Sequence, residues 1–102
     1  MSATLPESTW TFLTNHTHVL LCLSRDPGMR MRDIAQEVGI TERAVQRIIA
    51  DLRSTGYLTG TRDGRRVEYT VHRDKHLRHP LERGCRIGDV LDVLEHAMEG
   101  SK

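Results

Sequence analysis

The chain has 102 residues, enough for one hydrophobic core, and its formal net charge is only +1. The longest apolar run, residues 19–23, is too short to cross a membrane, and no basic leader opens the sequence, so we expect a soluble, cytoplasmic protein. Its two cysteines, Cys22 and Cys85, have no paired spacing, which argues against a disulfide framework and against a four-cysteine zinc site.

The first predicted element is a helix that ends near residue 24. Thr14 or Asn15 can cap it, because either side chain can accept a hydrogen bond from an unpaired amide of the first turn. Residues 25–28, Arg-Asp-Pro-Gly, then interrupt the chain, because proline cannot continue a helix and glycine tolerates a turn. The apolar residues at helical spacing are Val19, Leu20 and Leu23.

Residues 31–50 have the pattern of a helix-turn-helix unit. A second helix is predicted from about residue 30 to residue 38, and a third, capped by the Thr41 hydroxyl, runs to about residue 55. Gly39 can adopt the positive φ that ends one helix and redirects the chain, while the small Ala35 lets two crossing helices approach closely. The apolar positions of the unit are Ile34, Val38, Ile40, Val45, Ile48, Ile49 and Leu52. Such a unit usually places its second helix against DNA.

After Gly56 the apolar pattern changes from helical to alternating. Residues 57–61 and 67–71 are predicted to be strands, and Asp63-Gly64 between them favours a hairpin turn. The turn is flanked by three arginines, Arg62, Arg65 and Arg66. The hairpin therefore carries three cations beside the third helix.

Three helices followed by a hairpin are the order of a winged helix. Over about residues 15–71 the sequence resembles the MarR-like winged helix-turn-helix transcriptional regulators. Four motifs carry the resemblance: Arg32-Asp33-Ile34-Ala35, Val38-Gly39-Ile40-Thr41, Val45-Gln46-Arg47-Ile48 and Gly56-Tyr57-Leu58. The expected fold is α+β, mostly α, with a two-stranded wing and a C-terminal helix. The resemblance also implies that the third helix lies in the major groove of double-stranded DNA.

The outward face of the third helix is predicted to contact base edges. Arginine can bind both acceptors of guanine, glutamine can pair with adenine, and a small alanine permits contact with the thymine methyl group. The wing arginines are expected to bind phosphates or enter the minor groove, and so to supply affinity more than base choice. The predicted DNA-binding residues are Thr41, Arg43, Gln46, Arg47, Ala50, Arg62, Arg65 and Arg66. Alternatively, the helix arginines are solvated surface cations, with Arg47 paired to Asp51 one turn on.

The charge distribution supports contact with a polyanion. Residues 25–78 contain twelve Lys or Arg against eight Asp or Glu, a net +4, whereas residues 79–102 contain three against five, a net −2. This asymmetry favours DNA at the basic segment and repels it from the acidic one. The abundance of arginine can also reflect a GC-rich genome, so composition alone does not decide whether these arginines contact DNA.

The sequence suggests a winged-helix DNA-binding domain, residues 1–78, and a C-terminal helical segment, residues 79–102. The apolar stripe of this segment must be buried, either on its own domain or against a second subunit. We favour a homodimer, because two paired reading helices can meet a palindrome. The predicted dimer contacts are Ile87, Val90, Leu91, Leu94 and Met98. The dimerisation helices of the family are longer than this segment, which argues against a roomy effector pocket between subunits.

Two alternative functions stay open. His96 and Glu99, with Asp89 and Asp92 on the same helix face, would suit a metal-responsive regulator of the ArsR type, although such a face is more often solvated, and we predict no metal site and no cofactor. A winged helix can also dock another protein, but such a module would tend to lack the outward arginine and glutamine face. No nucleophile and base pair or glycine-rich phosphate loop stands out, so we expect no enzymatic activity.

Overall fold

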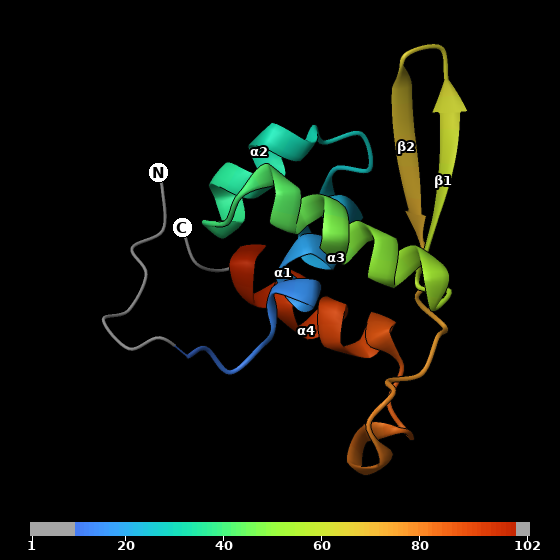
Figure 1. The fold of residues 1–102 in the computed structure, drawn as a ribbon. Helices are drawn as coiled ribbons and strands as arrows, with labels where there is room; N and C mark the ends of the chain where they lie inside the picture. Colours follow the sequence, from blue (N-terminus) through green and yellow to red (C-terminus); the bar gives the residue numbers. More distant parts are fainter. Residues whose placement is uncertain (1–9, 100–102) are drawn as a thin grey trace.

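The computed structural model describes residues 10–99, which form a mostly helical fold with a two-stranded antiparallel wing (Figure 1). The elements follow in the order α1 (Asn15–Arg25), α2 (Met31–Val38), α3 (Glu42–Ser54), β1 (Leu58–Asp63), β2 (Arg66–Val71), the 3-10 helix η1 (Pro80–Glu82) and α4 (Ile87–Glu99). The predicted α+β winged helix-turn-helix fold is thereby confirmed. Between residues 10 and 99 no helix has the length and hydropathy that a bilayer crossing requires.

The turn between α2 and α3 follows directly from the local sequence. Gly39 ends α2 with a φ of 86°, a left-handed backbone that glycine adopts without steric cost, and its N–H donates to the Ala35 carbonyl at 2.8 Å. Thr41 then caps α3, because its hydroxyl accepts a hydrogen bond from the Ala44 N–H at 3.0 Å. These two caps fix where α2 ends and where α3 begins.

α3 ends in a second glycine turn, from which the wing starts. Gly56 has a φ of 89°, and its N–H donates to the Arg53 carbonyl at 3.2 Å. The Tyr57 N–H donates to the Leu52 carbonyl at 2.8 Å. These two bonds are the Schellman pattern, which satisfies carbonyls that the end of a helix otherwise leaves unpaired.

The hairpin turn lies one residue later than predicted. Asp63 pairs with Arg66 in the strand register, so the two loop residues are Gly64 and Arg65 rather than Asp63 and Gly64. Gly64 has a φ of 65°, and between residues 10 and 99 only glycines have a positive φ. The loop therefore has the φ signs of a type II′ turn, which requires glycine at its first position only.

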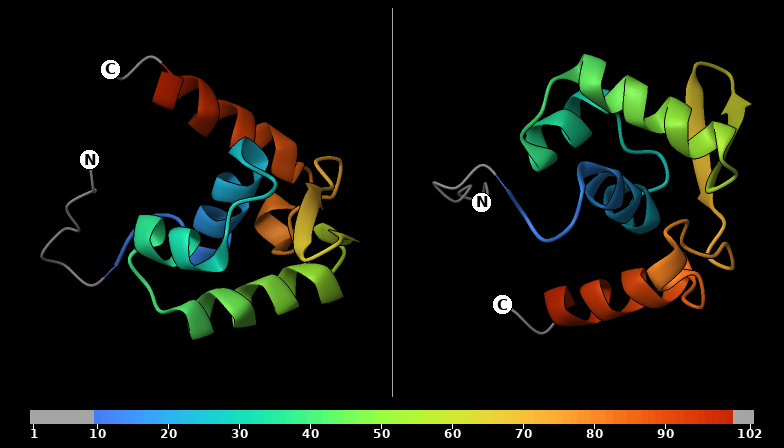
Figure 2. Two further views of the ribbon diagram at one scale, coloured as in Figure 1. Left: turned by 90° about the horizontal axis from the view of Figure 1, so that it is seen from above. Right: turned by 60° about the horizontal axis from the view of Figure 1, so that its bottom comes forward.

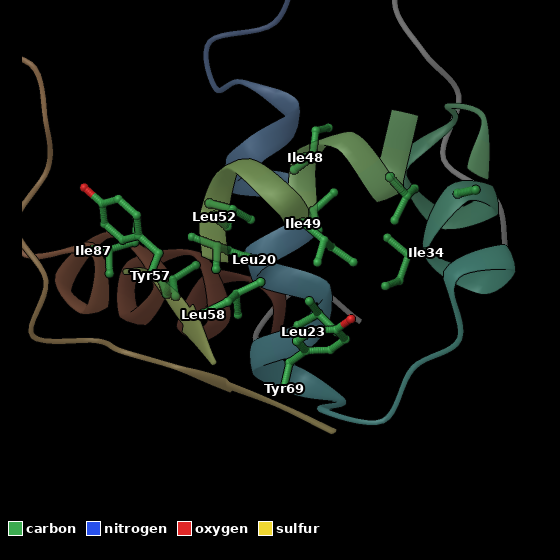
Figure 3. Packing of buried hydrophobic residues seen from close by; sticks show 14 residues of the cluster. Leu20, Leu23, Ile34, Ile48, Ile49, Leu52, Tyr57, Leu58, Tyr69 and Ile87 are labelled. Atoms are coloured by element: carbon green, nitrogen blue, oxygen red, sulfur yellow. The ribbon is translucent and has the colours of Figure 1, made fainter. Parts of the chain in front are cut away.

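One hydrophobic core joins α1, α2, α3 and α4 to the base of the wing (Figure 3). Its buried residues are Val19, Leu20, Leu23, Ile34, Ala35, Val45, Ile48, Ile49, Leu52, Tyr57, Leu58, Tyr69, Ile87 and Leu91. Figure 2 shows α1 in the middle, with α3 and α4 on opposite sides of it. α3 and α4 therefore form opposite faces of the molecule.

Ile87 and Leu91 belong to this core, which corrects the predicted dimer surface. Their exposed fractions are 5% and 0%, so neither side chain is accessible to a second subunit. The first turn of α4 is held down by backbone hydrogen bonds, from the Ile87 N–H to the Lys75 carbonyl at 2.8 Å and from the Gly88 N–H to the Arg73 carbonyl at 2.9 Å. Burial of one such leucine contributes about 1.5–3 kcal/mol. The C-terminal helix thus shares the core of the winged helix.

Candidate nucleic-acid interface

The outward face of α3 is exposed, as its spacing predicts. The four apolar residues on its other face are buried in the core. Among the described residues, none of the ion pairs involves an arginine of this face. Asp51 pairs instead with His16 of α1, at 3.0 Å between Oδ2 and Nε2, so the alternative pairing of Arg47 with Asp51 is wrong. The exposed residues of the predicted site are Arg43, Gln46, Arg47 and Ala50.

Thr41 stands at the start of this face. Its side chain is exposed, and its oxygen accepts the capping bond from the Ala44 N–H at 3.0 Å. The hydroxyl proton remains available to an acceptor such as a phosphate oxygen. Thr41 can therefore fix the helix end and contact a ligand with the same group.

The wing tip brings the other three predicted residues together. Arg62 is the residue of β1 before Asp63, which ends the strand, while Arg65 lies in the loop and Arg66 begins β2. All three are exposed, and none takes part in an ion pair within residues 10–99. Arg66 also reaches the loop before α2, where its Nη2 lies 3.4 Å from the position that a Cβ on Gly28 would occupy.

The wing is anchored to the helices along β2. The Tyr69 N–H donates to the Pro27 carbonyl at 3.0 Å, and the Tyr69 side chain is only 8% exposed. Gly60 lies opposite in the register, and a Cβ there would be 3.1 Å from Tyr69 Cε1, so the ring packs across a position that favours glycine. This attachment holds the cationic tip in a defined place relative to α3.

The segment after β2 contains contacts that the sequence analysis missed. The His72 N–H donates to the Tyr57 carbonyl at 2.9 Å, and the Tyr57 hydroxyl donates to the His76 carbonyl at 2.5 Å. Burial raises the pKa of the Tyr57 phenol, which keeps it a neutral donor. Arg73 forms ion pairs with two acids of α4. Because these partners are distant in sequence, no local periodicity reveals them.

An open cavity of about 690 Å³ lies where α1 begins and α3 ends. Leu20, Leu52 and Tyr57 contribute to its apolar lining, and His16 and Arg78 to its polar lining. Its size is in the range of small-molecule pockets. Because separate segments of the chain line it, no single sequence pattern predicts it.

The outer side of α4 keeps apolar surface that the core does not cover. Val93, which the sequence analysis did not select, is 70% exposed, and Met98 is 39% exposed. Val90 and Leu94 are half-buried. Within residues 10–99 no three His, Cys, Asp or Glu side chains are grouped so that they could hold a metal ion, and the metal-responsive alternative therefore gains no support from this helix.

The sequence of the helix-turn-helix unit matches a known class. Residues 13–59 match the family model described as winged helix-turn-helix DNA-binding. No functionally curated protein matches the chain. The matched range begins just before α1 and ends within β1, so it includes α3 but not the wing tip.

Solved structures share the overall fold. The predicted DNA-binding transcriptional regulator from E. coli has a TM-score of 0.56 at 18% identity, over 79% of this chain and 74% of its own. The PcaV transcriptional regulator from Streptomyces coelicolor, in complex with its natural ligand, has a TM-score of 0.53 at 26% identity, over 80% of this chain and 60% of its own. Lactococcus lactis ZitR in complex with DNA has a TM-score of 0.54 at 17% identity, over 100% of this chain and 70% of its own.

This chain spans between 60% and 74% of the lengths of the three proteins compared above. Residues 13–59 therefore resemble the winged helix-turn-helix DNA-binding family, and the chain shares its overall fold with these solved transcriptional regulators.

Proposed function

We propose that this chain is a transcriptional regulator that binds specific sequences in double-stranded DNA, with α3 in the major groove. The observation that carries the proposal is the outward face of α3, which is exposed and whose arginines lack ion-pair partners within residues 10–99. Arg43 and Arg47 can bind guanine or phosphate, Gln46 can pair with adenine, and Ala50 leaves room for the groove floor. Thr41 contributes a hydroxyl at the helix start.

The wing is proposed to contact DNA in a different way from α3. Arg62, Arg65 and Arg66 contact the flanking backbone or enter the minor groove, and they supply affinity without selecting bases. The support is their exposure on a hairpin that is anchored at Tyr69 to the loop between α1 and α2, so that the wing tip and α3 belong to one packed fold.

We also propose that the protein acts in the cytoplasm as a homodimer joined through the outer side of α4. Exposed Val93 and Met98, together with half-buried Val90 and Leu94, leave an apolar face that the core covers only in part. Because α3 and α4 lie on opposite sides of α1 (Figure 2), a dimer joined there leaves both reading helices outward. A regulator of this kind acts by binding, so the proposal includes no catalytic step and no cofactor.

Charge reversal on α3 tests the proposed function. In the Arg43→Glu/Arg47→Glu variant, two favourable contacts of about 1–3 kcal/mol each become repulsive, so we expect affinity for a selected duplex to fall about 30-fold or more. The matched control is Arg78→Glu/Arg83→Glu, which makes the same charge change at exposed positions outside α3 and the wing. Fluorescence anisotropy measures binding, and circular dichroism checks the fold. Full binding by a folded α3 variant would contradict the proposal and favour a protein-docking module.

A further inference from the structure

Arg73 connects three elements through one side chain. It lies two residues after the end of β2, where its Nη1–H donates to Ser24 Oγ of α1 at 2.7 Å. Its Nη2–H donates to Asp92 Oδ1 of α4 and, at 3.4 Å, to Glu95 Oε1. The Ser24 hydroxyl in turn donates to Glu95 Oε2 at 2.5 Å, which closes the network. The guanidinium thus joins the base of the wing to α1 and to α4.

The backbone makes the same connection. The Gly88 N–H of α4 donates to the Arg73 carbonyl at 2.9 Å, and the Arg73 Nη2–H reaches back to the Gly88 carbonyl at 3.4 Å. A Cβ on Gly88 would lie 2.8 Å from both Arg73 Cβ and the Arg73 carbonyl oxygen, so this close approach requires glycine. Any displacement of the first turn of α4 therefore acts directly on Arg73, two residues after the end of the wing.

We infer that Arg73 is a positioning residue that couples α4 to the wing, so that the placement of α4 sets how strongly the wing contributes to DNA binding. The inference rests on the proposed DNA-binding function. An isolated exposed ion pair would contribute little to the stability of this arrangement. Here, however, Glu95 has a side-chain exposure of only 24%, and the planar guanidinium binds several acceptors at once, a geometry that lysine cannot reproduce.

Two possible roles of Glu95, as a negative charge near DNA or as a positioning group for Arg73, predict opposite changes in DNA affinity when its charge is removed. Glu95→Gln removes a negative charge, and simple attraction to DNA would then strengthen binding. If Glu95 positions the wing through Arg73, the same change weakens binding. Ser24 and Arg73 donate to different oxygens of the Glu95 carboxylate, and glutamine has an NH2 donor in place of one of them and no charge to pair with Arg73. Glu99→Gln is the matched control, since it removes the same charge one turn further along α4 at an exposed residue.

The experiment measures affinity for a selected duplex as a function of salt for wild type, Glu95→Gln, Glu99→Gln and Arg73→Lys. We expect Glu95→Gln and Arg73→Lys to bind about 2- to 30-fold more weakly than wild type, whereas Glu99→Gln binds equally well or more tightly. Arg73→Lys keeps the charge, so its loss is due to geometry. In both weakened variants the slope of log K against log salt should fall by about 1 to 2, because wing contacts are lost. A variant that merely unfolds in part would keep its slope.

Hydrogen exchange of the free protein separates this inference from the proposed function. If Glu95→Gln speeds exchange of the wing amides and of the His72 N–H, but not of the α3 amides, the coupling is supported even if wild type binds no duplex. Faster wing exchange without any duplex binding by wild type would contradict the proposed DNA-binding function but not the coupling between α4 and the wing. If Glu95→Gln matches Glu99→Gln in affinity, slope and wing exchange, the positioning role of Arg73 is refuted while the DNA-binding proposal stands.

Discussion

Replacing the three wing arginines by glutamine should change how strongly DNA binding depends on salt. Arg62, Arg65 and Arg66 are exposed and form no ion pair within residues 10–99, so each is free to neutralise one phosphate. Each neutralised phosphate contributes about 0.9 to the slope of log K against log salt, so the triple variant should lose about 2.7 per bound chain. Between about 50 and 200 mM salt, wild type should then lose about 40-fold more affinity than the variant.

Base selectivity should survive this substitution. Phosphate contacts carry no direct sequence information, so the affinity ratio between a selected and a scrambled duplex should stay the same in the triple variant. Titration by fluorescence anisotropy at several salt concentrations measures both quantities. The matched control replaces Arg78, Arg83 and Arg86 by glutamine, around η1 at the far end of the molecule from the wing tip (Figure 1).

The control also removes three positive charges, but from the end of the molecule opposite the wing tip (Figure 1), and salt screens exposed charges that are more than about 8–10 Å apart. Its salt slope should therefore stay close to that of wild type. An equal drop in slope for both triple variants would refute a local role of the wing. A loss of selectivity in the wing variant alone would show that the wing contacts bases.

Three further predictions concern the core and its thiol. Leu91→Ala should destabilise the fold by about 2–5 kcal/mol in urea denaturation because Leu91 is fully buried, whereas Val93→Ala should stay within about 0.5 kcal/mol at a concentration where the protein is monomeric. Gly88→Ala should cost about 1–3 kcal/mol because the new methyl group collides with Arg73, and an unchanged melting temperature would contradict the close approach. Cys22 should react with iodoacetamide more slowly in the folded than in the urea-unfolded protein at the same alkaline pH, since burial raises the pKa of its thiol; equal rates by mass spectrometry would contradict this burial.

The helix-turn-helix and the wing were predictable because their signals are local. The exposed side of α3 follows from one helical period, and its ends follow from Thr41 and Gly56, whose capping roles depend only on residues nearby in the chain. The hairpin turn was misplaced by one residue because Asp-Gly and Gly-Arg can both occupy a two-residue loop. The positive φ of Gly64 with a negative φ at Arg65 selects the second arrangement.

The C-terminal helix was harder to interpret because its partners are distant in sequence. An apolar stripe shows that α4 must be buried, but it does not show what covers it. The structure divides the stripe between the protein's own core, at Ile87 and Leu91, and the outer surface near Val93. The Arg73 network was missed for the same reason, since its bond to Ser24 spans 49 residues and that of Ser24 to Glu95 spans 71.

Selection of bound duplexes from a random pool by the wild-type protein, with the stoichiometry of the complex measured alongside, tests most directly whether the outward face of α3 reads DNA. We expect enrichment of a short defined sequence, arranged as two inverted half-sites with two chains bound, and loss of that enrichment in the Arg43→Glu/Arg47→Glu variant. Absence of any enriched sequence at low salt from a folded wild-type protein would contradict it.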